Sequence, residues 1–283
     1  MERQGDSLIR LMLIALLLIG ATPEVFADVT ASFMAVRHRG CADKPGVPGA
    51  LHRNRRLDAV ARLLADGQKA RDAELRVGYR ESSAAVFRIP GVTEDAQIER
   101  ALIRQFCGPV TDREYTEIGT YRDGPVVWAV MARPMQPPAP RDAEAISRRV
   151  LELTNAARAT ARQCGREPFG AAPPLKLSPV LHHAAMAHSK DMATHSLFDH
   201  IGSDRSSPAD RVTRAGYKWR MVGENIASGI ETADAVVRGW LDSPGHCENI
   251  MGPRFSEMGV AYYFDPKSAD GIYWTQEFGT PAR

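Results

Sequence analysis

The chain has 283 residues, of which 44% are hydrophobic and 25% are charged. This balance is typical of a globular protein and excludes a collagen-like, a wholly disordered or a multi-span membrane protein. Lys and Arg number 36 against 34 Asp and Glu, a formal charge of +2, so the net charge indicates neither a nucleic acid nor an anionic membrane as partner. At this length we expect one or two domains, each with its own core.

The first 27 residues predict a secretory signal peptide that is removed from the mature protein. Arg3 and Arg10 precede an apolar run at residues 11–21, and residues 25–27, Val-Phe-Ala, have the small-residue pattern of a signal-peptidase site. An uncleaved membrane anchor is the alternative, but 11 apolar residues fall short of the ~20 that a spanning helix needs. We therefore expect a secreted protein, periplasmic or extracellular, with no membrane span in its mature form.

Four cysteines follow the signal peptide: Cys41, Cys107, Cys164 and Cys247. An even number of cysteines in an oxidising compartment favours two disulfides over thiolate catalysis or a zinc site. The count alone permits three pairings, so the choice among them depends on how the chain is organised.

Landmarks recur at matching intervals in the two halves of the chain, which predicts an internal duplication. An aromatic residue and a glycine follow two of the cysteines by 8 and 12 residues; they are Tyr115 and Gly119 after Cys107, and Phe255 and Gly259 after Cys247. A Gly-Tyr pair precedes each of these cysteines, and an aromatic strand closes each half. We therefore expect residues 28–133 to form a shortened, degenerate copy of the unit at 144–283. One disulfide is expected within each copy: Cys41 to Cys107 and Cys164 to Cys247.

The junction and the second unit divide into elements by their patterns. Residues 134–143 hold four prolines within seven residues, which predicts a stiff, extended linker. Apolar spacing predicts helices at 144–162, from Ser178-Pro179 onward, and at 232–242 before Ser243-Pro244-Gly245. Strand patterns follow at 257–264 and 271–278. Helices that alternate with a small antiparallel sheet predict an α/β fold, arranged as a three-layer α/β/α sandwich.

Four motifs between residues 144 and 280 resemble those of the CAP superfamily. They are AHSKDMATHSLFDH, GENIASG, WLDSPGHCENI, and FSEMG followed by Tyr273-Trp274. This superfamily of SCP-domain proteins includes cysteine-rich secretory proteins, insect venom antigen 5 and plant pathogenesis-related proteins, and the resemblance is to its bacterial secreted branch. It implies the CAP fold, a three-layer α/β/α sandwich, for residues 144–283.

The resemblance implies an open cleft in which two histidines and an acid converge: His200 in the FDH motif, Glu224 in GEN and His246 in SPGH. Two neutral imidazoles are suitable ligands for Zn²⁺, and a nearby glutamate can orient a bound water or take its proton. His200 and His246 are therefore candidate zinc ligands, and all three are candidate catalytic residues. The alternative is a surface role for the histidines and a loop hydrogen bond for Glu224. His188, on the apolar face of its predicted helix, is expected to be a packed core residue and not a ligand.

The chain departs from the animal and plant members of the superfamily at one acid. Those members usually carry a second acidic residue three positions after the helix tryptophan, and here that position is Ser243. Asp242 is adjacent, but one residue along a helix is a rotation of about 100°. Two histidines without a second carboxylate predict weak zinc binding, which also weakens the case for hydrolysis.

The first unit lacks all three residue types of the candidate site. It has Phe106 where the second unit has His246, and Ala84, Ala85 or Val86 opposite the GEN motif, depending on where the gap is placed. It is also shorter across the stretch that contains the first histidine of the site. We therefore expect any ligand or chemistry to belong to the second unit.

Three functions follow from these expectations. The favoured one is a secreted, non-enzymatic binding module whose cleft takes a small amphiphilic or peptide ligand, such as a lipid or a cell-envelope component, as the resemblance implies. The alternative is a zinc-dependent, peptidase-like hydrolase that uses His200, Glu224 and His246. The third is a scaffold whose two units jointly present an interface. No Gly-x-Ser-x-Gly motif or Cys-His pairing offers another nucleophile.

Overall fold

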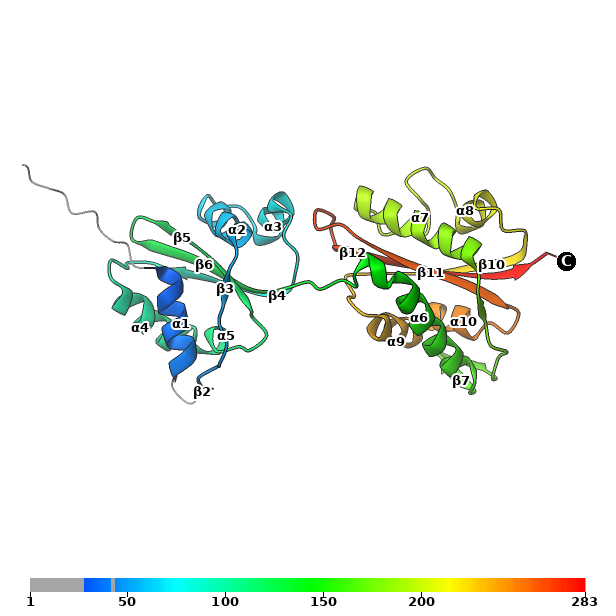
Figure 1. Cartoon of the computed structure of the whole chain (residues 1–283), viewed down its shortest axis with the longest axis horizontal. Coiled ribbons are helices and arrows are strands. Elements are labelled where there is room, and N and C mark those ends of the chain that lie inside the picture. Colours follow the sequence, from blue (N-terminus) through cyan, green and yellow to red (C-terminus); the bar gives the residue numbers. More distant parts are fainter. Residues whose placement is uncertain (1–27, 42–43, 283) are drawn as a thin grey trace, which may run out of the picture.

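The computed structural model describes residues 28–41 and 44–282, so the predicted signal peptide at 1–27 lies outside the described residues. The described residues form two α/β units that follow one another along the chain (Figure 1). In this part of the chain, no helix is both long enough and apolar enough to cross a membrane.

The C-terminal unit is built on a four-stranded sheet of order β10-β12-β11-β9. Its strands are β9 (Lys176–Leu177), β10 (Trp219–Ser228), β11 (Glu257–Phe264) and β12 (Ile272–Pro281). β12 is antiparallel to both β10 and β11, and the short β9 runs parallel to β11 at one edge. The strand β12 therefore lies inside the sheet and has a partner on each side.

Helices cover both faces of this sheet. On one face lie α7 (Pro179–His195) and α8 (Pro208–Arg214), and on the other α6 (Ala143–Arg158), α9 (Ala233–Asp242) and α10 (Pro244–Met251) (Figure 1). A 3-10 turn at Pro140–Asp142 leads into α6, and a hairpin of β7 (Arg162–Cys164) and β8 (Glu167–Phe169) follows it. The α/β/α sandwich predicted for this half of the chain is confirmed.

The central strand β12 sends alternate side chains into two cores. Trp274 and Phe278 pack in the larger core with residues of α6, α9 and α10, and Tyr273 packs with residues of α7. Gly259 of β11 lets α7 lie directly on the sheet, because a Cβ there would stand 2.1 Å from the backbone N of His182. The face that carries α7 is therefore closely covered.

Local signals predicted where two helices begin. The Ser178 side chain caps α7 and Pro179 takes its first position, where the missing N–H costs nothing. Thr232 caps α9 in the same way. The strands predicted at 257–264 and 271–278 correspond to β11 and β12, the second of which extends to Pro281.

One boundary was predicted incorrectly, and the helix α10 was missed. The helix expected at 144–162 ends at Arg158, because residues 162–164 instead pair in the β7–β8 hairpin. The Ser243-Pro244-Gly245 run ends α9 as expected but also begins α10, because proline is well tolerated in the first turn of a helix. β10 and α8 had no predicted counterpart.

The N-terminal unit has a sheet of the same arrangement, of order β3-β5-β6-β4. Its strands are β3 (His52–Arg53), β4 (Glu81–Ile89), β5 (Glu117–Asp123) and β6 (Val126–Pro134). β6 is antiparallel to β4 and β5, and β3 is parallel to β5. Strand order and directions match those of the C-terminal sheet position by position, although a common origin of the two units stays a prediction.

Helices also cover both faces of the N-terminal sheet. On one face lie α2 (Arg55–Ala65) and α3 (Ala70–Val77), and on the other α1 (Val29–Arg39), α4 (Asp95–Gln105) and α5 (Cys107–Val110) (Figure 1). The two short strands β1 (Gly40–Cys41) and β2 (Lys44–Pro45) pair after α1. Each face has a separate hydrophobic core.

Each unit contains one disulfide. Cys41 is bonded to Cys107 and Cys164 to Cys247, which confirms both predicted bridges. They span 66 and 83 residues of sequence respectively, so each ties the segment after the first helix of its unit to a later helix. The chain between β6 and α6 corresponds to the predicted linker at 134–143.

Candidate functional site

The three predicted site residues come from three separate parts of the C-terminal unit. His200 lies in the loop between α7 and α8, Glu224 in the middle of β10, and His246 in the first turn of α10. Ile226 of β10 packs with residues of α7, so Glu224, two positions earlier, points to the same face of the sheet. The loop and the strand thus meet on the side covered by α7.

His200 and Glu224 form the centre of the site. Nδ1 of His200 lies 2.7 Å from Oε1 of Glu224, and Nδ1 donates because an ionised carboxylate can only accept. This hydrogen bond raises the pKa of His200, against the opposing effect of burial. The Glu224 side chain is 1% exposed and that of His200 is 48% exposed, so Nε2 of His200 is the atom of this pair that is left for a ligand.

Arg211 holds the other oxygen of Glu224. Its Nη2 lies 2.6 Å from Oε2 of Glu224 and also donates to the His200 carbonyl, while its Nη1 donates to the carbonyl of Ser206. Burial by itself raises the pKa of Glu224, but the His200 hydrogen bond and the Arg211 charge outweigh it and hold that pKa below its ordinary value. Glu224 is therefore an ionised, buried carboxylate with both oxygens occupied.

His188 supports the site from inside α7, and it is the packed core residue that was expected. Its side chain is fully buried, and its Nε2 donates to the Asp199 carbonyl at 3.0 Å and lies 3.8 Å from Oε1 of Glu224. Burial lowers the pKa of His188 by more than the nearby carboxylate raises it, so the ring is neutral near pH 7. The bond to Asp199 fixes the residue that precedes His200 in the loop.

His246 is tied to the site through contacts between α10 and β10. Asn249 donates to the Glu224 carbonyl and to Oδ1 of Asn225, and Asn225 donates to the His246 carbonyl. His246 is half-buried. Burial lowers the pKa of its imidazole, and the positive charge of His200 lowers it further. The structure therefore brings His200 and Glu224 into direct contact and places His246 within electrostatic reach as a neutral imidazole.

Two residues of the site, Arg211 and Glu277, were not predicted from the sequence. Glu277 of β12 is the register partner of Glu224 and is fully buried. Burial, and then the charge of Glu224, raise the pKa of Glu277 well above its ordinary value. Its signal in the sequence is the single acid in the otherwise uncharged strand IYWTQEFG, because a buried carboxyl group needs a partner. Arg211 has no comparable signal, since arginines are ordinary residues of short, exposed helices.

The donor set does not fit the zinc ion that the resemblance suggested. Catalytic zinc sites use three protein ligands, and the described residues contain no group of three or more His, Cys, Asp or Glu side chains placed to hold a metal ion. Both oxygens of Glu224 are bonded to His200 and Arg211, so at most two imidazoles remain as ligands. No chemical step at this site is therefore assigned to a metal.

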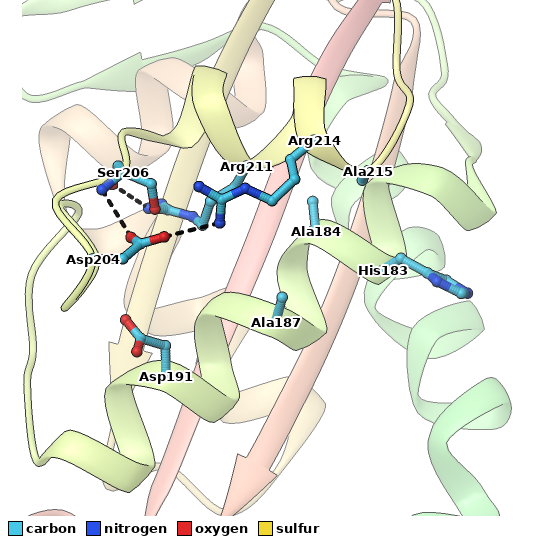
Figure 2. Close-up of a pocket in the computed structure, with 9 residues that line it drawn as sticks. All are labelled: His183, Ala184, Ala187, Asp191, Asp204, Ser206, Arg211, Arg214 and Ala215. Atoms are coloured by element: carbon cyan, nitrogen blue, oxygen red, sulfur yellow. Dashed lines mark hydrogen bonds and ion pairs between the residues drawn. The ribbon is translucent and has the colours of Figure 1, made fainter.

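A hollow of about 440 Å³ between α7 and α8 shares Arg211 with the site. It is lined by His183, Ala184, Ala187, Asp191, Asp204, Ser206, Arg211, Arg214 and Ala215 (Figure 2). Figure 2 shows that Asp204 accepts from the Ser206 backbone and from Arg214, which leaves less of their polar capacity for a ligand. None of the three predicted site residues belongs to this lining, so the candidate site is the exposed edge of His200 and not this hollow.

Comparison with known proteins gives the family context of the site. The CAP family model, described as the cysteine-rich secretory protein family, matches residues 151–278. The uncharacterized protein YkwD of Bacillus subtilis is 36% identical over 140 residues, which are 50% of this chain and 49% of that protein. The uncharacterized membrane protein YlbC of the same species is 32% identical over 94 residues, 33% of this chain and 25% of that protein. The chain thus spans half or less of the length of these curated relatives.

Two solved structures are similar to part of the chain. An extracellular protein containing a SCP domain from Bacillus anthracis is 24% identical with a TM-score of 0.42, and the match covers 57% of this chain and 56% of that one. An outer surface protein from Borrelia burgdorferi is 18% identical with a TM-score of 0.41, covering 50% of this chain and 95% of that one. The CAP family model therefore matches the C-terminal unit, and the matched residues include His200, Glu224 and His246.

Proposed function

We propose that this chain is an exported CAP-domain protein that binds a small amphiphilic ligand at the exposed edge of His200. The observation that carries the proposal is that both oxygens of Glu224 are occupied. A carboxylate that is 1% exposed and bonded to His200 and Arg211 holds the imidazole in place and is closed to the solvent water that a general base would activate. Nε2 of His200, a half-exposed side chain whose Nδ1 is taken by Glu224, is then the donor for an acceptor group of the ligand.

The charges at the site favour an anionic headgroup. The charge of Arg211 is balanced by Glu224, and the raised pKa of His200 keeps more of this imidazole protonated near neutral pH. A protonated imidazole forms charge-assisted hydrogen bonds with carboxylates and phosphates, which are about twice as strong as neutral ones. A ligand with a carboxylate or phosphate group therefore fits this position.

Exposed apolar side chains stand on both sides of His200 in its loop. Phe198 is 51% exposed and Ile201 is 47% exposed. Single exposed apolar residues are ordinary on protein surfaces, but these two flank a half-exposed histidine in the sequence of one loop, so the loop carries apolar and polar groups together. This combination supports a ligand with an apolar tail and an anionic head.

Export is part of the same proposal. Its supports are the signal peptide predicted at residues 1–27 and the two disulfides, because disulfides form and persist in oxidising compartments. We expect the mature protein to begin at Asp28. Mass spectrometry of the protein recovered from the periplasmic and medium fractions tests this, and recovery of the uncleaved chain in the cytosol would contradict it.

Calorimetry with a matched pair of amphiphiles tests the ligand. Dodecyl phosphate and dodecyl maltoside, each below its micelle concentration, share a tail and differ in the headgroup. The mature chain is expected to bind the phosphate at least about tenfold more tightly, because only this headgroup forms a charge-assisted bond with His200. An equal affinity for both headgroups would contradict the anionic part of the proposal.

Three variants assign the binding to this site. His200→Gln and Phe198→Ser should each weaken binding of dodecyl phosphate by about tenfold, the value of one hydrogen bond or one apolar contact. His52→Gln, which changes an exposed histidine of the N-terminal unit, is the matched control and should leave the affinity unchanged. Binding that survives His200→Gln at full strength would place the ligand elsewhere.

Zinc titration and hydrolysis assays test the alternative of a metal-dependent hydrolase. The two-imidazole donor set is expected to give no micromolar zinc binding and no turnover of peptides or esters. Micromolar zinc binding that is lost in His200→Ala and in His246→Ala, together with turnover, would replace the binding function by a hydrolase.

A further inference from the structure

Glu277 is a buried carboxyl group at the centre of the sheet. It lies on β12 and is the register partner of Glu224 on β10. Its side chain is fully buried, and neither of its oxygens meets a hydrogen-bond donor among the described residues. Because register partners on one face of a sheet have Cβ atoms about 5 Å apart, the two carboxyl groups are neighbours.

The opposite side of Glu277 offers no other partner. Its register partner there is Gly259 of β11, which has no side chain. The backbone of α7 lies on this glycine, where a Cβ would stand 2.1 Å from the backbone N of His182. The close approach of α7 therefore covers this part of the sheet, and the neighbour of Glu277 across the register is Glu224.

The charged groups around Glu277 make an ionised form unfavourable. Glu224 of β10 and Arg211 of α8 act on Glu277 directly, and the titratable groups His188 of α7 and His200 of the loop between these helices act on Glu224. Burial and the charge of Glu224 raise the pKa of Glu277, and they outweigh the opposing charge of Arg211. The Nη atoms of Arg211 donate to Glu224 and to two carbonyl oxygens, and its buried Nε makes no hydrogen bond to Glu277 among the described residues. A second buried negative charge would have no donor of its own.

We propose that Glu277 is a protonated carboxylic acid that donates its O–H to the carboxylate of Glu224, so that the two groups share one proton. A protonated acid has the donor that this arrangement requires. Glu277 is then a positioning residue that fixes the Glu224 carboxylate beneath His200. The consequence for ligands rests on the proposed function: with one negative charge in the pair, Arg211 and a protonated His200 leave the site net positive for an anionic headgroup.

The N-terminal unit shows that the fold does not require carboxyl groups at the register positions of Glu224 and Glu277. The three residues in register are Glu224, Glu277 and Gly259 in the C-terminal unit, and Val86, Val130 and Gly119 in the N-terminal unit. Both glycines lie against a helix backbone. Two valines thus occupy in one sheet the positions that two carboxyl groups occupy in the other.

Infrared spectroscopy tests the protonation of Glu277 without any ligand. At pH 8 the other strongly shifted acid, Glu74, with a pKa of about 7, is mostly ionised. The wild-type mature chain should then show the C=O stretch of a protonated carboxylic acid. Glu277→Gln should lose this band, because glutamine keeps the shape and an N–H donor but carries no acid proton. Glu144→Gln, at an exposed position, is the control and should retain it. A wild-type spectrum without the band, or a band that persists in Glu277→Gln, would overturn the proposal.

NMR titration of His200 gives an independent readout of the charge on Glu277. If Glu277 is neutral, Glu277→Gln removes no charge, and the pKa of His200 should stay within about 0.3 of the wild-type value. If Glu277 is ionised, the same substitution removes a nearby negative charge and lowers the pKa of His200 by about one or more. The second result would refute the shared proton.

Binding of dodecyl phosphate tests the positioning role. Glu277→Val, matched to Val130 of the N-terminal unit, removes the donor and should weaken binding about tenfold, whereas Glu277→Gln should stay within about twofold of the wild type. Circular dichroism verifies that each variant folds. The infrared test does not depend on the folding of Glu277→Val, because it uses only Glu277→Gln. Wild-type affinity in Glu277→Val would remove the positioning role. If the wild type itself does not bind this probe, the proposed function fails, while the infrared and NMR results still decide the state of Glu277.

Discussion

Arg211 is the buried cation of the site, and its removal tests how the charges there are held. Its side chain is 5% exposed and that of Glu224 is 1% exposed. In the N-terminal unit Ala73 takes the same place: each residue lies five positions before a Gly-Tyr pair, on α3 and α8 respectively. Arg211→Ala leaves a buried carboxylate without its cation, a change that typically costs about 3–5 kcal/mol. With an m-value of about 2 kcal/mol/M, the urea midpoint of the C-terminal unit should fall by about 2 M.

A triple variant separates the charge from the packing. Arg211→Ala with Glu224→Val and Glu277→Val copies the three residues that the N-terminal unit carries: Ala73, Val86 and Val130. Replacing a complete buried ion pair by apolar residues is often neutral or stabilising, whereas removing one partner is costly. The triple variant should therefore be about 2–4 kcal/mol more stable than Arg211→Ala, although both lack the same arginine side chain.

Urea unfolding followed by tryptophan fluorescence measures both variants. A Trp128→Phe background leaves only the tryptophans of the C-terminal unit as reporters: Trp219, Trp240 and Trp274. Without Arg211, burial should raise the folded-state pKa of Glu224 above its unfolded value, so the single variant should regain stability as the pH is lowered from 7 to about 5. A loss below about 1 kcal/mol for Arg211→Ala, or a triple variant no more stable than the single one, would refute this account of the site.

Removing the second disulfide by Cys164→Ser with Cys247→Ser should cost the C-terminal unit about 4 kcal/mol, because a bridge across 83 residues no longer restricts the unfolded chain. Thermal unfolding of the variant and the wild type measures this loss. NMR titration should give His200 a pKa above the ordinary 6.5 and His246 a pKa below it; the reverse order would contradict the roles of the hydrogen bond and of burial. Burial and a neighbouring carboxyl raise the pKa of Glu74 from 4.5 to about 7, so the melting temperature of the N-terminal unit should fall between about pH 5 and pH 8. Over this range the unfolded state has already lost the proton that the folded state retains, and Glu74→Gln should flatten the dependence.

Features with a local cause were predicted from the sequence. The Ser178-Pro179 start of α7 follows from capping chemistry, and both disulfides followed from intervals that recur along the chain. The contact between His200 and Glu224 was predicted only through the family motifs. Nothing in the local chemistry of either residue indicates a partner 24 positions away.

The parts that were missed depend on tertiary contacts. α8 and α10 have seven and eight residues, too few to establish a helical period. β10 carries two polar residues at its centre, Glu224 and Asn225, which face opposite sides of the sheet and are matched by Glu277 and Gln276 on β12. A polar dipeptide in a strand resembles a loop until its partners are known. The carboxyl pair is a product of strand register, which a single sequence does not reveal.

The two units differ most where the site is built. Between α7 and α8 the chain runs through residues 196–207, whereas only residues 66–69 separate α2 from α3. The longer loop carries His200, and the buried positions beneath it are charged. The corresponding positions of the N-terminal unit are Ala73 and Val130, which are buried, and Val86, which is 43% exposed. The loop and the charges are absent together because a buried charge without its partner costs more than an apolar residue in the same place. The same sheet arrangement therefore accommodates a complete polar site or none, and a variant with only part of the network should be less stable than either.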